Sequence, residues 1–322
     1  MKVFVSRTLP GDTIDALRAT PGLDVDVWEN ITPPPRDEVV RRVAGCDGLL
    51  SMLTERVDDA VFDAAPDLRV VSNMAVGVDN IDVAAATARG IPVGHTPGIL
   101  TDATADIAFA LILASRRRLV EGVDLVRSGG WVPWYPEFMV SQPVAGQTLG
   151  LIGYGRIAQA VARRARGFDM EILVHTRTPP DDPDVTAVSL EDLLRRADIV
   201  SLHCPLTPET RHLIDADALA AMKTTATLVN TARGPVVDET ALVAALQDGT
   251  IAGAGLDVTE IEPLPADSPL PSLTNCVVIP HLGSATIPTR TLMAERAVTN
   301  LLAGLAGEPL PHTVNPGVGN SD

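Results

Sequence analysis

Basic residues and cysteines are both scarce in this 322-residue chain. Lysine and arginine together number 25 against 41 acidic residues, which gives a formal net charge of -16. A nucleic-acid-binding protein needs a basic face, so that class is disfavoured, although one arginine can still hold an anionic small ligand inside a cleft. The three cysteines, Cys46, Cys204 and Cys276, are odd in number, scattered and without metal-ligand spacing. They predict a reducing compartment and no metal site.

Long hydrophobic runs are also missing. The longest aliphatic run, Ile107 to Ala114, falls well short of the roughly 20 residues that a membrane-spanning helix needs. The first residues, MKVFVSRTLPG, are too short an apolar stretch for a signal peptide and are typical of a strand. The 46% of apolar and 20% of charged residues indicate a folded chain. We expect a cytoplasmic protein that binds neither membrane nor nucleic acid.

Short β-branched runs alternate with helical patterns along most of the chain. Five strands are expected at residues 2–6, 24–28, 48–51, 70–74 and 91–95. Six more are expected at residues 148–154, 170–176, 198–203, 226–232, 252–258 and 275–281. Helices are expected at residues 12–20, 36–45, about 101–121 and 289–308. Strands that alternate with helices predict parallel βαβ units with both faces of the sheet covered.

This alternation predicts an α/β fold with two Rossmann-like, doubly wound parallel-sheet domains. The chain is long enough for two domains of ordinary size. The first domain is expected over residues 1–98 and the dinucleotide-binding domain over 99–286, because six strands with crossover helices match a complete dinucleotide-binding sheet. The final segment, 287–322, is expected to pack back on the first domain.

A glycine-rich turn opens the second series of strands. Gly153, Gly155 and Ala158 form the pattern G-x-G-x-x-A directly after a strand and at the start of a helix. The first glycine permits a tight turn, the second lets the backbone approach a pyrophosphate, and the small third residue lets helix and strand pack closely. Glycines in an ordinary turn are the alternative, but the strand–turn–helix context favours a dinucleotide site.

The end of the next strand indicates which dinucleotide is bound. An NAD site places an acid there for the ribose 2′-hydroxyl, whereas an arginine suits a 2′-phosphate. This chain has Arg177 flanked by Thr176 and Thr178, and no acid before Asp181. NADP(H) is therefore predicted, with NAD(H) as the alternative, because arginine pairs with phosphate through two hydrogen bonds. A solvated loop arginine is the other reading.

Three polar residues follow late strands, at the sheet edge where ligands bind in such folds. Arg233, Glu262 and His281 together suit the reduction of a 2-oxo acid. The arginine can hold the carboxylate and polarise the oxo group, and the histidine can protonate the developing alkoxide. Glu262, bonded to the other ring nitrogen, would stabilise the imidazolium.

Each of these residues also has an ordinary structural explanation. Arg233 could be a surface charge, Glu262 a turn cap, and His281 a histidine with a structural partner. Their order and their shared position after strands favour the catalytic reading. The remaining histidines lack such company and are expected to be structural or exposed: His95, His175, His203, His212 and His312.

Five ordered motifs resemble the D-isomer-specific 2-hydroxyacid dehydrogenases, and most closely their glyoxylate/hydroxypyruvate reductase branch. They are NMAVGVDNIDVAAATARGIPVGHTPGILTDATADIA, GLIGYGRIAQAVARR, NTARGPVVDE, GLDVTEIEPLP and PHLGSAT. The resemblance covers nearly the whole chain and implies that Arg233, Glu262 and His281 are the catalytic trio. It also implies that the backbone at Val76 and Gly77 binds the substrate carboxylate. Two lobes with a cleft between them are implied as well.

The same resemblance implies further contacts. Asp257 would lie by the nicotinamide amide, Thr231 by the nicotinamide ribose and Pro205 along the adenosine. Three residues complete the implied cofactor set: Arg156, Ile157 and Gly283. A homodimer joined through the nucleotide domains is implied, with Trp134 reaching into the neighbouring subunit's substrate site. The residues after Trp134 depart from the branch pattern, so interface packing is the alternative for this side chain.

The function expected from these features is the NADPH-dependent reduction of glyoxylate to glycolate or of hydroxypyruvate to D-glycerate. A reductase for bulkier 2-oxo acids is the alternative within the fold, with Met52, Leu53 and the Trp134 region near the pocket wall. A nucleotide-sensing corepressor is a third hypothesis. The presence of all three catalytic residues counts against it.

Overall fold

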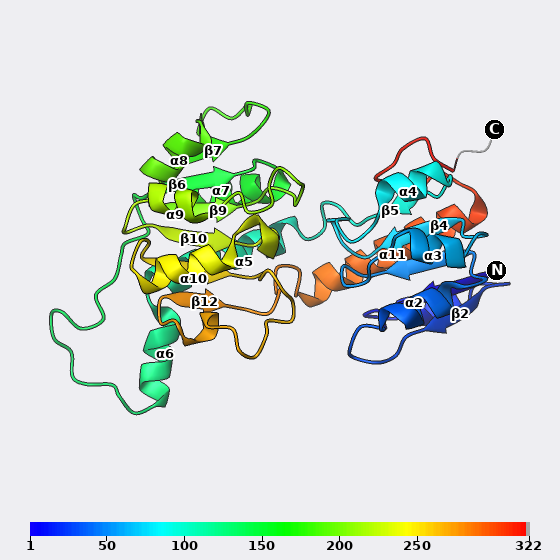
Figure 1. The fold of residues 1–322 in the computed structure, drawn as a ribbon, viewed down its shortest axis with the longest axis horizontal. Coiled ribbons are helices and arrows are strands. Elements are labelled where there is room, and N and C mark those ends of the chain that lie inside the picture. Colours follow the sequence, from blue (N-terminus) through cyan, green and yellow to red (C-terminus); the bar gives the residue numbers. More distant parts are fainter. Residues whose placement is uncertain (320–322) are drawn as a thin grey trace. The chain divides into compact units, whose positions relative to one another are not determined.

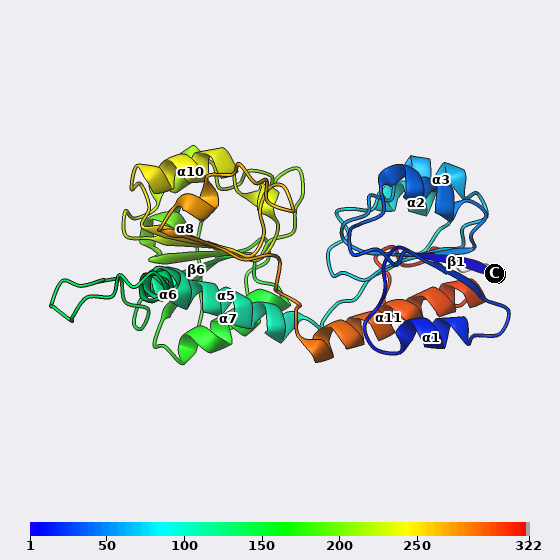
Figure 2. The same cartoon turned by 90° about the horizontal axis from the view of Figure 1, so that it is seen from below.

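A computed structural model of the protein describes residues 1–319 and divides into two compact units. Unit 1 consists of Met1–Leu100 and residues 286–319, and unit 2 of Thr101–Ala285. Each unit is a parallel sheet with helices on both faces (Figures 1 and 2). The predicted α/β fold with two parallel sheets is confirmed. The last three residues of the segment 287–322 lie outside the described part of the chain.

Unit 1 has a five-stranded sheet in the order β2-β1-β3-β4-β5. Its strands are β1 (Lys2–Val5), β2 (Asp24–Val27), β3 (Gly48–Ser51), β4 (Val70–Asn73) and β5 (Val93–Gly94). Its helices are α1 (Thr13–Arg18), α2 (Arg36–Val43), α3 (Asp59–Ala64), α4 (Val83–Ala88) and α11 (Ile287–Ala306). Helices α1 and α11 cover one face and α2 and α3 the other (Figure 2). The chain order changes direction between β1 and β3, which makes that position the switch point of unit 1.

Unit 2 has a seven-stranded sheet in the order β12-β11-β10-β9-β6-β7-β8. Its strands are β6 (Thr148–Ile152), β7 (Glu171–His175), β8 (Thr186–Ala187), β9 (Ile199–Leu202), β10 (Thr227–Asn230), β11 (Gly253–Leu256) and β12 (Cys276–Val278). This is the dinucleotide-binding order with one additional strand, and its switch point lies between β6 and β9. The prediction of six strands is therefore one short, because β8 has only two residues, both exposed, and carries no hydrophobic pattern.

The helices of unit 2 correct a second expectation. They are α5 (Thr101–Arg116), α6 (Leu119–Arg127), α7 (Arg156–Arg166), α8 (Leu190–Arg196), α9 (Ala216–Ala221) and α10 (Glu239–Gln247). The single helix predicted from Thr101 to Glu121 is wrong, because Arg118 has a left-handed backbone (φ 52°) that ends one helix and begins another. Two hydrogen bonds from the Arg118 guanidinium to Glu121 hold this break, at 2.6 and 2.8 Å.

Local sequence explains where most helices begin. Side-chain oxygens of short polar residues accept a hydrogen bond from the first turn, which satisfies a backbone N–H that has no partner within the helix. The residues that cap helices in this way are Asp58, Asp82, Ser189, Asp215, Asp238 and Thr286. The central strands are buried along their whole length, as a parallel sheet covered on both faces requires.

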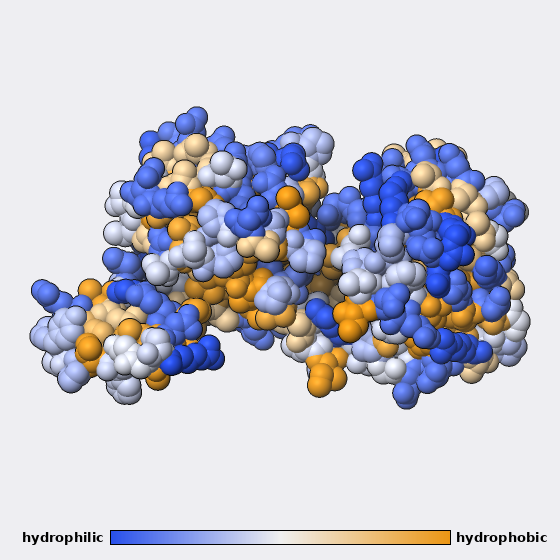
Figure 3. Space-filling view, turned by 60° about the horizontal axis from the view of Figure 1, so that its bottom comes forward, coloured by the Kyte–Doolittle hydropathy of each residue, from blue (hydrophilic) through white to orange (hydrophobic). Residues whose placement is uncertain are grey.

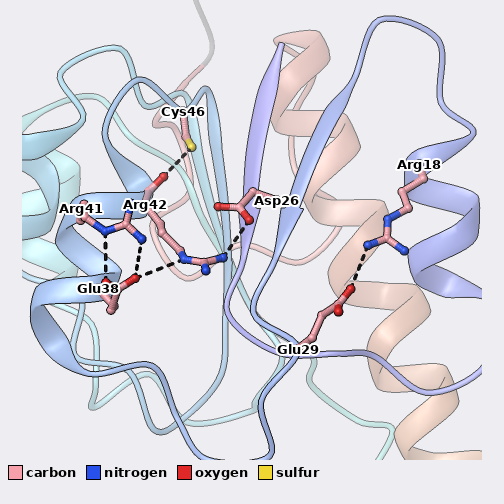
Figure 4. A network of polar contacts seen from close by, with 7 residues as sticks. All are labelled: Arg18, Asp26, Glu29, Glu38, Arg41, Arg42 and Cys46. Carbon is pink, nitrogen blue, oxygen red and sulfur yellow. Dashed lines mark hydrogen bonds and ion pairs between the residues drawn. The ribbon is translucent and has the colours of Figure 1, made fainter.

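Ion pairs link the edge strand β2 of unit 1 to the neighbouring helices (Figure 4). Arg42 of α2 donates to Asp26 on β2 at 2.8 Å and to Glu38 at 3.4 Å, and its guanidinium lies over the Trp28 ring, 5.0 Å from the centroid. Exposed pairs of this kind contribute only about 0–1 kcal/mol each. They orient α2 against the edge strand, while the buried side chains supply most of the stability. Among residues 1–319, the helices are all too short or too polar to cross a membrane.

Candidate active site

The glycine-rich turn lies between β6 and α7. Gly153 has φ +86°, and a Cβ atom there would lie 2.9 Å from backbone atoms of His203 and Cys204, so only glycine fits without strain. Gly155 is the N-cap of α7 and provides no side chain to cap the helix. A Cβ at Gly155 would meet nothing within 4 Å, and Ala158 is fully buried against the sheet. The first N–H groups of α7 therefore face open space, where a phosphate can bind.

A cavity of about 1020 Å³ adjoins this turn within unit 2. It brings together the predicted cofactor residues Gly153, Gly155, Thr176, Arg177, Thr178 and Pro205. Arg156 and Ile157 are the first two residues of α7 and are not among its lining residues. The cavity joins the ends of β6, β7 and β9, so it lies at the switch point where such a sheet binds the adenosine part of a dinucleotide.

The charge in this cavity is mixed. Arg177 is exposed there, and its positive field contributes, after a hydrogen bond from Thr207, to the lowered pKa of Glu209. Burial lowers the pKa of His203 to about 4, and its Nε2 atom lies 2.9 Å from Ser201 Oγ. His203 is therefore neutral at pH 7. Arg177 is therefore a cation that a 2′-phosphate would meet in this cavity, unlike His203.

The pair that is predicted to deliver the proton, Glu262 and His281, follows strands β11 and β12. His281 Nδ1 lies 2.8 Å from Glu262 Oε2, and the other oxygen of Glu262 accepts from the Thr259 N–H at 3.2 Å. An ionised carboxylate only accepts hydrogen bonds, so Nδ1 is the donor and Nε2 is left for the substrate. Both side chains are about one-third exposed, at 29% and 33%. Glu262 thus orients the His281 ring through Nδ1, and Nε2 remains available.

The backbone of His281 is held in an uncommon conformation. Its φ is +51°, in the left-handed region that costs a residue with a Cβ about 1 kcal/mol or more. The His281 N–H donates to the carbonyls of Asp257 (2.9 Å) and Ile279 (3.1 Å). The Asp257 carboxylate accepts from the N–H groups of Leu282 and Gly283, at 2.5 and 2.9 Å. Burial raises the pKa of Asp257, whose fixed carboxylate shapes the turn that presents the imidazole.

Arg233 follows β10 on an equally constrained turn. The Asn230 side chain donates to the Arg233 carbonyl at 2.9 Å and accepts from the Ala232 N–H at 3.0 Å. A Cβ on Gly234 would lie 1.8 Å from the Thr259 carbonyl oxygen. The segment after β10 therefore packs directly against the segment after β11, which carries Glu262. Neighbouring strands thus bring the turns bearing the guanidinium and the carboxylate into contact.

Thr231 provides a test of whether a cofactor fits here. Its side chain is 8% exposed, and its Oγ1 atom is buried without a hydrogen-bond partner among residues 1–319. Buried hydroxyls without partners are rare and costly, so such an atom indicates a missing ligand group. The ribose that the family resemblance places beside Thr231 would supply one, and with the glycine turn and the cavity the residues present fit a dinucleotide.

The predicted carboxylate-binding backbone lies in unit 1, after β4. Among the described residues, no acceptor is paired with the N–H groups of Val76 and Gly77. Their carbonyls are engaged, Val76 O with His95 Nδ1 at 3.0 Å and Gly77 O with Asn73 Nδ2 at 3.2 Å. Asn80 ties the loop to the segment after β3 by donating to the carbonyls of Met52 and Glu55. These bonds fix the loop through its carbonyls and through Asn80, while the N–H groups of Val76 and Gly77 remain available as donors.

Trp134 lies in the projecting segment that follows α6 (Figure 1). Its side chain is 80% exposed, and apolar atoms lie on this part of unit 2 in the space-filling view (Figure 3). The other large apolar side chains exposed on α6 and the segment after it are Leu119, Val120, Val123, Val126, Trp131, Val132, Tyr135 and Val140. So large an exposed apolar surface is typical of a protein interface.

Several polar contacts were not visible in the sequence. His212, which was expected to be structural or exposed, has an acidic partner: its Nε2 lies 2.8 Å from Glu260 Oε1. Tyr154, Arg166 and Asp182 form a network in the cofactor cavity. The position of Tyr154 between the two glycines was the one signal that could have drawn attention to it.

Comparison with known proteins identifies the family. Residues 109–283 match the model of the NAD-binding domain of the D-isomer specific 2-hydroxyacid dehydrogenases. A glyoxylate reductase of Korarchaeum cryptofilum is 50% identical over 319 residues, which cover 98% of this chain and 96% of that protein. The chain belongs to the D-isomer specific 2-hydroxyacid dehydrogenase family. The resemblance found in the motifs is confirmed, and unit 2 contains the family's NAD-binding domain.

Solved structures of this family have the same fold. A protein of Thermus thermophilus superposes with a TM-score of 0.93 at 51% identity, covering 98% of this chain and all of that one. An NADPH-dependent glyoxylate/hydroxypyruvate reductase of Sinorhizobium meliloti, solved with NADP and malonate, superposes with a TM-score of 0.84 at 34% identity. That alignment covers 97% of this chain and 96% of the other.

Proposed function

We propose that this dehydrogenase reduces glyoxylate, and hydroxypyruvate as a second substrate, with NADPH. The observation that carries the proposal is the His281–Glu262 pair, 2.8 Å apart and oriented with Nε2 available. It follows the last strands of a sheet whose first turn suits a dinucleotide. Relatives that are half identical over nearly the full chain bear the name glyoxylate reductase, which supports the substrate.

Each residue of the trio then has a defined role. The nicotinamide, when bound, supplies hydride to the 2-oxo carbon. Arg233 holds the substrate carboxylate by a forked hydrogen bond and polarises the oxo group. His281 donates the Nε2 proton to the developing alkoxide, while Glu262 keeps the ring oriented. The product is glycolate from glyoxylate and D-glycerate from hydroxypyruvate.

Unit 1 is proposed to complete the substrate site. The N–H groups of Val76 and Gly77 would bind the substrate carboxylate together with Arg233. Two backbone donors and a guanidinium match the acceptors of one carboxylate. Residues 1–98 with 287–322 would then form the substrate domain and residues 99–286 the cofactor domain. Asp257 and Gly283 would lie beside the nicotinamide.

A substrate series tests this function. NADPH oxidation would be followed with glyoxylate, hydroxypyruvate, pyruvate and a branched 2-oxo acid, each over a full concentration range. We expect the highest kcat/KM with glyoxylate or hydroxypyruvate. A higher value for the branched acid would reject the assignment in favour of a reductase for bulkier substrates.

The preference for NADPH rests on Arg177 with Thr176 and Thr178. Arg177→Ala should lower kcat/KM for NADPH by about tenfold, the contribution of hydrogen bonds to a charged group, and leave the value for NADH nearly unchanged. Arg195→Ala on α8 removes the same charge from an exposed position of unit 2 and serves as the control. A wild-type protein that prefers NADH would reject the assignment of NADP(H).

We also propose a homodimer joined through the nucleotide domains. The support is the apolar surface of α6 and the segment after it, where Val126 is 56% and Trp134 80% exposed. Val126→Asp should convert the dimer to monomer in sedimentation, whereas Arg127→Asp, on the next residue, should not. In such a dimer Trp134 would reach the partner's substrate site. A monomeric wild-type protein would contradict both statements.

A cytoplasmic location is the last part of the proposal. The three cysteines are unpaired, and Cys46 is buried. Free thiols of this kind suit a reducing compartment, where a dissolved 2-oxo acid and NADPH would both be available. Fractionation of the host cell, followed by immunodetection, would test this placement.

A further inference from the structure

The cofactor cavity contains a polar network that joins three separate segments. Tyr154, between the two glycines of the turn, donates its hydroxyl to Asp182 Oδ2 at 2.7 Å. Arg166, the last residue of α7, donates to both oxygens of Asp182 at 2.8 Å. The Arg166 Nε atom also lies 3.2 Å from Asp184. The glycine-rich turn, the end of α7 and the loop after β7 are thus joined through one carboxylate.

This carboxylate lies where charge affects the choice of cofactor. Asp182, Arg166 and Arg177 line the same cavity, and Asp182 is five residues after the arginine proposed to bind the 2′-phosphate. In this fold an acid near the end of the second strand accepts a hydrogen bond from the ribose 2′-hydroxyl of NAD. A free carboxylate at this position would therefore attract NADH and repel the phosphate of NADPH.

The network removes both effects. One oxygen of Asp182 accepts from Tyr154 and Arg166, and the other accepts from Arg166 and from the Asp184 N–H at 3.1 Å. The Tyr154 hydroxyl and the guanidinium lower the pKa of Asp182, so the group is ionised and its charge is offset by Arg166. An acid so engaged has little capacity left for a ribose hydroxyl.

We propose that Arg166 and Tyr154 are specificity-determining positioning residues. Both hold Asp182 away from the cofactor, and Arg166 offsets part of its charge, so that the cavity accepts a 2′-phosphate. The proposal rests on the NADPH preference proposed above. It assigns that preference to two contributions: Arg177 attracts the phosphate, and Arg166 suppresses a nearby repulsive acid.

Binding of two cofactor fragments isolates this contribution. Adenosine 2′,5′-bisphosphate carries the 2′-phosphate and adenosine 5′-monophosphate lacks it, so the ratio of their dissociation constants reports on that phosphate alone. In Arg166→Met we expect this ratio to shift about tenfold against the bisphosphate, a typical effect of an unpaired like charge. The kcat/KM ratio of NADPH to NADH should fall in parallel.

The double variant Arg166→Met/Asp182→Asn decides the mechanism. Removing the acid together with its partner should return both ratios to within about threefold of the wild type, because the two residues act through one interaction. Arg163→Met is the matched control, since Arg163 lines the same cavity but pairs with Asp102 at 3.0 Å. It should change the ratios by less than about twofold, as expected for a distant charge screened by salt.

Tyr154→Phe keeps the ring and Arg166 and should shift the ratios by about threefold, the contribution of one hydrogen bond. It keeps the test decisive if Arg166→Met does not fold. A wild type that favours NADPH, with ratios unchanged in both variants, would reject this inference alone. Equal effects of Arg163→Met and Arg166→Met, or no recovery in the double variant, would also overturn it. A wild type that favours NADH would reject the proposed function as well.

Discussion

The two units have the same architecture but use their switch points in opposite ways. In unit 1, the residues that follow β1 and β3 converge on Glu55, whose carboxylate accepts from Ser6 Oγ at 2.5 Å and from the Met52 N–H at 2.7 Å. Thr54 Oγ1 donates to its other oxygen. Glu55 is 3% exposed, so unit 1 fills the position where an open sheet binds a ligand with its own anion.

In unit 2 the equivalent position is open. The glycines after β6 leave room where unit 1 places side chains, and the cavity of about 1020 Å³ begins there. The donors that unit 1 satisfies internally are left for a phosphate in unit 2. The same arrangement of strands and helices therefore gives a closed scaffold in one unit and a cofactor site in the other, because the turn residues differ.

The largest expected effect concerns the chemistry assigned to unit 2. His281→Ala should lower turnover of glyoxylate by about 10³-fold, within the usual range of 10²–10⁴ for a general acid. His312→Ala in unit 1 also removes an imidazole. It keeps the backbone N–H that donates to the Asn300 side chain, and it should leave turnover nearly unchanged. Steady-state kinetics at saturating NADPH measure both. Undiminished turnover in His281→Ala would remove the proposed acid.

The second-largest effect is expected at the turn after the first strand of unit 2, compared with the same turn in unit 1. Gly153→Ala should weaken NADPH binding by about 100-fold, because the left-handed backbone and the contact at 2.9 Å together cost a few kcal/mol. Gly11 also has a positive φ, +68°, but its Cβ would meet only the Thr291 methyl group at 3.5 Å. Gly11→Ala should therefore lower stability and leave the dissociation constant, measured by NADPH fluorescence, unchanged. Equal loss of binding in both variants would contradict the comparison.

A smaller effect tests the closed switch point of unit 1. Glu55→Gln keeps the shape but turns one acceptor into a donor that faces other donors, which should lower the free energy of unfolding by about 1–3 kcal/mol. Urea denaturation followed by circular dichroism measures this change. Glu29→Gln, at a side chain that is 71% exposed, should change it by less than about 0.5 kcal/mol. If Glu55→Gln instead weakens NADPH binding at unchanged stability, the assigned role is wrong.

The smallest expected effect concerns the loop of unit 1 that is proposed to bind the substrate. Asn80→Ala removes two bonds to the segment after β3 and should raise KM for glyoxylate about fivefold, as the donors of Val76 and Gly77 become less well oriented. Asn275→Ala breaks a bond to the Leu246 carbonyl in unit 2 and serves as the control. An unchanged KM would show that the loop does not depend on Asn80.

The sequence predicted the strands well where they are buried, and less well elsewhere. Strands β9 to β11 are buried throughout, and β6 is buried after its first residue, so the mainly hydrophobic runs between turn residues located them. Strand β8 was not predicted because its two residues are exposed and join the sheet only through their backbone. The break after α5 was not predicted because the residues around Arg118 favour a helix. The left-handed conformation of Arg118 is held by a side-chain contact.

For the candidate site, too, the sequence predicted some features and not others. Motifs located the glycine turn and the candidate catalytic trio, because each residue's type and its place after a strand indicate its chemistry. They did not reveal that Glu55 closes unit 1, that His212 pairs with Glu260, or that Arg166 neutralises Asp182. These contacts join residues 16 to 49 positions apart. No local pattern specifies such a pair, because the partners meet only after the strands have aligned.

The sequence by itself determined the family, the two parallel sheets and the identity of the candidate catalytic residues. These follow from hydrophobic periodicity and from turn chemistry, which act over a few neighbouring residues. Only the tertiary structure decided which switch point is open and which carboxylates are neutralised. Those properties depend on the distances between side chains from different strands and helices, and packing alone sets them.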